Sequence, residues 1–165
     1  MLSLTTKRGH AMSSVEPIQQ PVTGHEAISD PSQPLAALSQ FYRAFNRRDL
    51  ALMESNWDPA EAVMDNPLGG IKRGWKEIRP VYERIFSGRG QVEVEFYDYT
   101  LQRHGEVFVA IGRERGRYTS PKATFELAIR TTRVFRKQNG GWRQIHHHGS
   151  IEDPNLLAHY QDAVR

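Results

Sequence analysis

Three consecutive histidines near the C-terminus are the residues of this chain best suited to chemistry. They lie in residues 140–150, whose sequence is GGWRQIHHHGS. Because strand side chains alternate between two faces, His146 and His148 are predicted to share one face with Trp142, while His147 lies on the other. Imidazole is the side chain most easily tuned for proton transfer or metal ligation near neutral pH. The pattern predicts a lined pocket in which His146 and His148 act, and it leaves the reaction open.

A metal site is an alternative use of the same two histidines. Two imidazoles on one strand face, together with a carboxylate from Glu114 or Asp65, would form a set of two histidines and one carboxylate. The spacing identifies no certain third ligand. We therefore expect no metal and no cofactor.

Composition indicates one domain of ordinary balance and excludes several classes of protein. The chain has 165 residues, of which 38% are hydrophobic and 25% charged, and these suit a single core. The formal net charge is only +3, whereas nucleic-acid binding calls for a dense basic stripe. No apolar run reaches about 18 residues, so no membrane partner is expected. The absence of cysteine excludes disulfides and thiolate chemistry, and it fits a cytoplasmic protein.

The hydrophobic period changes along the chain and divides it into elements. Residues 1–33 are rich in Ser, Thr, Gln, Pro and Gly and are expected to form a disordered or loosely packed arm. Residues 34–165 are expected to form one domain. Helical spacing and then strict alternation predict the following elements. They are helices at 34–48, 50–57, 75–86 and 154–164, and strands at 62–64, 92–101, 106–118, 124–137 and 142–150.

These elements predict an α+β fold built on long antiparallel strands. Strands of ten or more residues must twist and curl. A cone-shaped curled sheet wrapped around the N-terminal helices would enclose an internal pocket, the usual place for a small-molecule site. The small residues Ala110 and Gly112 suit the wall of that pocket. The same alternation then turns Glu114 inward, where it would meet the two inward histidines.

The chain resembles the NTF2-like superfamily, in its SnoaL-like and ketosteroid-isomerase-like branch. The segments that carry the resemblance are FYRAFNRRD at 41–49, AVMDNPLG at 62–69, RGWKEI at 73–78 and GWRQIHHHGS at 141–150. The resemblance covers about residues 35–151 and implies the cone-shaped sheet, its pocket and a homodimer formed through the sheet. It also implies that Arg130 and Thr132 face the pocket, with Tyr42 and Asn66 at its edge.

The ketosteroid isomerase reaction itself is not expected, because three positions depart from that pattern. Those enzymes place an aspartate base directly before the proline at the exit of the first strand, and Asn66 stands there. An amide cannot accept a proton at any useful pH. Their oxyanion tyrosine falls near Phe41 and their second oxyanion acid near Thr131.

Two functions of different classes remain open. The first is a cofactor-independent enzyme doing isomerase, dehydratase or cyclase chemistry on a small, partly apolar organic molecule. His146 or His148 would transfer the proton while Glu114 orients an imidazole, and Arg130 or Asn66 would hold an anionic substrate oxygen. The second is a non-catalytic module that binds a small molecule or dimerises, in which these groups form only a buried polar network. The remaining substrate-binding candidates are Tyr42, Trp57 and Thr132.

Overall fold

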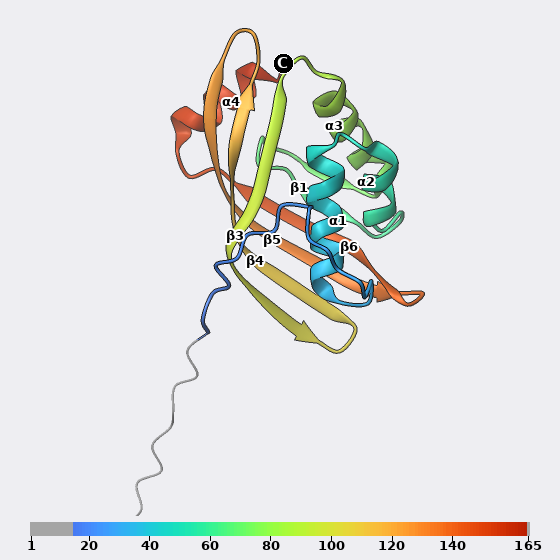
Figure 1. The fold of residues 1–165 in the computed structure, drawn as a ribbon. Coiled ribbons are helices and arrows are strands. Elements are labelled where there is room, and N and C mark those ends of the chain that lie inside the picture. Colours follow the sequence, from blue (N-terminus) through green and yellow to red (C-terminus); the bar gives the residue numbers. More distant parts are fainter. Residues whose placement is uncertain (1–14, 165) are drawn as a thin grey trace, which may run out of the picture.

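A curled six-stranded sheet carries the fold, and three of the helices lie together on one side of it (Figure 1). The computed structural model describes residues 15–164. Its helices are α1 (Pro34–Asn46), α2 (Leu50–Asn56), α3 (Trp75–Ser87) and α4 (Pro154–Ala163). Its strands are β1 (Val63–Asp65), β2 (Ile71–Arg73), β3 (Gln91–His104), β4 (Val107–Thr119), β5 (Thr124–Gln138) and β6 (Gly141–Ser150). The predicted α+β class is confirmed.

The strands follow the order β2-β1-β6-β5-β4-β3 across the sheet. The long strands β3 to β6 form an antiparallel meander, whereas β1 pairs with β6 in parallel. The parallel pairing sets Asp65 opposite His148. Strand β2 was not predicted, since none of its three residues is buried and, unlike β1, it shows no apolar run.

A proline and a capping residue mark the starts of the first two helices, as the sequence predicts. The Asp49 carboxylate accepts a hydrogen bond from the N–H of Leu52 at 2.9 Å and caps α2. Helix α1 begins at Pro34, and its residues Leu38 and Phe41 are buried in the core. No helix within residues 15–164 is both long and apolar enough to cross a membrane.

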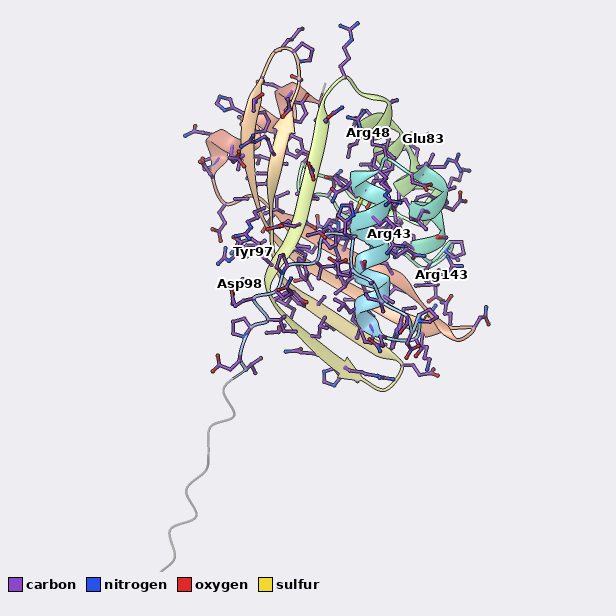
Figure 2. All side chains as sticks on the ribbon, viewed as in Figure 1. Arg43, Arg48, Glu83, Tyr97, Asp98 and Arg143 are labelled. Atoms are coloured by element: carbon purple, nitrogen blue, oxygen red, sulfur yellow. The ribbon has the colours of Figure 1, made fainter. Side chains whose placement is uncertain are left out.

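Residues 15–33 pack against the domain as an N-terminal strap. The backbone N–H and C=O of Val22 pair with Phe96 of β3 at 2.8 and 2.9 Å, and Val22 is 1% exposed. Gly24, at φ +90°, lies so close to α1 that a Cβ would clash with the backbone of Arg43. Figure 2 shows Asp98 beside the point where this strap meets β3. The prediction of a disordered or loosely packed arm is therefore wrong at Val22 and Gly24, whereas most of residues 15–33 is exposed or half-buried and residues 1–14 lie outside the described part.

A β-bulge in β6 decides which side chains reach the concave face. Phe135 of β5 pairs with Gln144, but the preceding Val134 pairs with His146, so Ile145 is an extra residue in β6. The alternation of β6 is inverted beyond that residue. Before the bulge the even-numbered residues Trp142 and Gln144 are buried, as alternation predicts. After it the odd-numbered residues His147 and Gly149 are buried instead.

Candidate functional site

A pocket lies between the concave face of the sheet, the helices α1 and α3, and the C-terminal helix α4. Its cavity of about 50 Å³ exceeds the 10–15 Å³ or so that one water needs. Most of the wall is apolar and includes aromatic rings from α1, α3 and α4. The polar groups in the wall are Asn66, Glu114, Arg133 and His147.

His147 is the histidine that faces this pocket. It is 5% exposed, and neither ring nitrogen has a hydrogen-bond partner among residues 15–164. Burial, followed by the nearby positive charge of Arg133, lowers the pKa of His147 well below its ordinary value. The imidazole is therefore neutral near pH 7, with one N–H donor and one lone pair available.

His146 and His148 point away from the pocket, so their predicted orientation is wrong. Nδ1 of His146 lies 3.0 Å from the carbonyl oxygen of Val63. Nδ1 of His148 lies 3.1 Å from Oδ2 of Asp65, and the His148 side chain is half exposed. The prediction assumed unbroken alternation, which the bulge at Ile145 interrupts. Nowhere in the described residues do three His, Cys, Asp or Glu side chains gather to hold a metal.

Glu114 is buried on the concave face, as predicted, and belongs to a network with Arg133. Nη2 of Arg133 donates to Oε1 of Glu114 at 2.7 Å, and the Tyr42 hydroxyl donates to the same oxygen at 2.7 Å. Nε of Arg133 donates to the Tyr42 oxygen at 3.2 Å, and Nη1 donates to Gln144 Oε1 at 2.9 Å. The guanidinium carbon lies 3.5 Å from the ring centre of Phe41. All three side-chain nitrogens of Arg133 thus donate hydrogen bonds, and the flat face of its guanidinium packs on the Phe41 ring.

The charges of this network stabilise each other. Burial alone would lower the pKa of Arg133, but the neighbouring Tyr42 and Glu114 outweigh it and raise that pKa. Burial raises the pKa of the Tyr42 hydroxyl well above its ordinary value. Arg133 is therefore a fixed cation and Tyr42 a neutral hydrogen-bond donor.

Arg133 was missed by the sequence analysis, which placed Arg130 and Thr132 in the pocket instead. Both residues lie on the outer face of β5, where Arg130 pairs with Glu152 at 2.8 Å. Strand β5 has no bulge between Leu127 and Arg133, so its odd-numbered residues all face inward. The apolar residues Leu127, Ile129 and Phe135 share the parity of Arg133, and this alternation indicates that Arg133 faces inward.

The other predicted binding residues lie at different depths. Asn66 lines the pocket, and its Oδ1 accepts a hydrogen bond from the N–H of Leu68 at 2.9 Å. Tyr42 lies beneath the pocket wall, where its hydroxyl supports Glu114. Trp57 is 1% exposed and packs in the core against Tyr82, with ring centres 6.4 Å apart. Of these three, only Asn66 can touch a molecule in the cavity.

Comparison with known proteins identifies the family. The model of the SnoaL-like domain matches residues 35–154, which is most of the chain. The chain belongs to the SnoaL-like domain family. Together with the fold and its cavity, this membership describes a SnoaL-like pocket protein with the NTF2-like fold. The comparison with curated proteins gave no match.

Solved structures share the same architecture. A Thiobacillus denitrificans protein, provisionally described as a calcium/calmodulin-dependent protein kinase type II association domain, is 26% identical, with a TM-score of 0.60. The match covers 73% of this chain and 96% of that one. An NTF2-like protein of Streptomyces avermitilis, provisionally described as a dehydratase, is 22% identical, with a TM-score of 0.64 over 69% and 89% of the two chains. An NTF2-like superfamily protein of Salmonella enterica is 20% identical, with a TM-score of 0.61 over 69% and 84%.

Proposed function

We propose that this SnoaL-like protein binds a small, partly apolar organic molecule and performs acid/base chemistry on it with His147. One observation carries the proposal. A buried, neutral imidazole faces a mostly apolar cavity, and none of the described residues pairs with either of its ring nitrogens. Buried polar groups in proteins are nearly always hydrogen-bonded, so an exception in a cavity wall points to a ligand.

The geometry supports proton transfer within the bound molecule. The lone pair of His147 can accept a proton from a C–H or O–H group, and the resulting imidazolium can return it to another atom. Glu114 lines the same cavity as His147. Isomerisation, dehydration and cyclisation all follow this pattern and need no cofactor. The role first predicted for His146 and His148 thus passes to His147.

A non-catalytic binding module is the second candidate. The Glu114–Arg133–Tyr42 network is fully paired within the protein, which is also what a purely structural polar core requires. In that case the cavity would hold a molecule without changing it. A cytoplasmic location remains a prediction for either function.

Histidine-ring NMR tests the proposal on the full chain. Neutral six-membered-ring compounds are added to ¹⁵N-labelled protein, and we expect a binder to shift the His147 ring signals. The matched variants are His147→Gln, which should lose the response, and His148→Gln, which should keep it because His148 lies outside the cavity. No response at His147 from any compound would contradict the proposal.

Isotope exchange separates the two functions. The compound that binds is incubated with the protein in D₂O, and its C–H signals are followed by ¹H NMR. Faster loss of a C–H signal with the wild type than with His147→Gln supports an acid/base enzyme. Binding with no exchange and no product indicates the binding module.

A further inference from the structure

The positive and negative charges in the cavity wall cancel each other. Arg133 and Glu114 are the only formally charged side chains in the described lining, and they form an ion pair at 2.7 Å. The remaining lining groups are apolar or uncharged, since His147 and the tyrosines are neutral near pH 7. The wall as a whole therefore carries no net charge, although the chain is basic.

Arg133 has little left with which to bind an anion. Each of its three nitrogens already donates to a protein acceptor, and its face lies on the ring of Phe41. A ligand carboxylate would have to compete with Glu114 for the guanidinium. It would also lose its hydration in an apolar cavity without gaining an unpaired cation.

The wall instead offers hydrogen-bond acceptors. The two hydrogen bonds that Glu114 accepts from Tyr42 and Arg133 both go to Oε1. His147 adds a lone pair on one ring nitrogen and an N–H on the other. These groups match a ligand that carries an O–H or N–H donor.

We propose that the natural ligand is a small, uncharged molecule with an apolar body and at least one hydroxyl or N–H donor, and that carboxylates and phosphates are rejected. This inference rests on the proposed function, because it concerns the same cavity. It also replaces the earlier expectation of an anionic substrate oxygen held by Arg130 or Asn66. Charge neutrality sets the preference for uncharged molecules, and the unpaired lone pair of His147 sets the need for a donor.

Three probes with the same ring test the proposal at about pH 7: benzyl alcohol, benzoate and toluene. They are titrated into the wild-type protein, and the dissociation constants are taken from the His147 ring shifts. We expect benzyl alcohol to bind roughly tenfold or more tightly than benzoate, because the carboxylate is charged. We also expect it to bind more tightly than toluene, which has no donor.

A charge-altering variant makes the test sharper. Glu114→Gln leaves Arg133 as a net positive charge in the wall, so benzoate should gain affinity and benzyl alcohol should lose it. The double variant Glu114→Gln/Arg133→Gln restores neutrality and should again favour benzyl alcohol. Circular dichroism identifies which variants are folded, and the wild-type comparison stands without them.

The outcomes separate the two proposals. If benzoate binds the wild type as tightly as benzyl alcohol, the ligand class is wrong while the binding function survives. Equal binding of toluene and benzyl alcohol would remove the donor requirement. If none of the three probes shifts the His147 ring, the inference is overturned together with the assignment of the cavity as a binding site.

Discussion

Arg133 and Glu114 form an ion pair in the cavity wall, and both side chains are almost fully buried. Removing one partner of a buried pair leaves an uncompensated charge in a medium that solvates it poorly. The pair also orients Tyr42 and Gln144, so its loss disturbs the wall as well as the charge balance.

We expect Arg133→Met to lower the free energy of unfolding by about 3–5 kcal/mol, as for other broken buried pairs. The double variant Arg133→Met/Glu114→Leu should lose less than the single variant, because no charge remains unpaired. Urea denaturation measures both. The control is Arg130→Met, whose exposed pair with Glu152 should be worth less than about 1 kcal/mol. A small effect at Arg133 would show that Glu114 is well solvated.

His147 should make the stability depend on pH. Its pKa is lowered in the folded protein, so the unfolded chain binds the proton more readily. Stability is complete above the unfolded value of about 6.5 and falls as the pH drops below it, by at most about 1.4 kcal/mol per pH unit. The groups whose positive charge lowers the pKa of this ring are Arg133 from β5 and, on its own strand, His146 and His148.

The comparison of two glutamine variants isolates that effect. His147→Gln should flatten the dependence of the unfolding free energy on pH between about 6.5 and 5. His148→Gln should leave the slope near that of the wild type, since His148 is half exposed. Equal slopes in the wild type and His147→Gln would mean that the ring is solvated in the folded state.

Helix α4 borders the cavity and buries few of its residues. Tyr160 is its one buried residue and lines the cavity. Nε2 of Gln161 donates to the carbonyl oxygen of Leu68 at 3.0 Å, and the Tyr118 hydroxyl donates to Ala163 at 2.9 Å. An element with few buried contacts opens at a low free-energy cost. We expect α4 to gate the entry of ligands.

The absence of cysteine allows a direct test of this gate. A single Ile129→Cys places a thiol in the cavity wall, and its reaction with a thiol reagent is timed. Adding Gln161→Ala should speed the reaction several-fold, because the link to Leu68 is lost. Adding Asn155→Ala, at the exposed start of α4, should not. Equal rates in all three proteins would show that molecules enter elsewhere.

Across the whole molecule, the outer face of the sheet presents two rows of side chains. Val109, Val134 and His146 form one row across β4, β5 and β6, and Ile111, Thr132 and His148 form the next. Ile111 is 41% exposed. We propose that a second copy of the chain covers this face, which is the homodimer that the family resemblance implies.

Light scattering after size-exclusion chromatography tests the dimer. We expect the wild type to have the mass of two chains and Ile111→Glu to have the mass of one, since a buried carboxylate without a partner opposes association. Ile18→Glu serves as the control because Ile18 is 39% exposed on the strap, away from these rows. A wild-type monomer at high concentration would contradict the proposal.

The amino-acid sequence by itself determined the class of the fold and the inward position of Glu114. Those features follow from local periods, which each helix and strand keeps wherever its neighbours lie. The cap of α2 and the segments shared with the family are equally local. Strand β2 was missed because its residues are exposed or half-buried and form no apolar run.

Only the tertiary structure decided which histidine reaches the cavity. One extra residue at Ile145 reverses the parity of β6, and its cost is balanced by pairing with β5 across the whole strand. The strap is likewise ordered by its long-range pairing with β3. The register of distant segments depends on contacts that no local pattern encodes. His147, rather than its two neighbours, therefore faces Arg133 and the cavity.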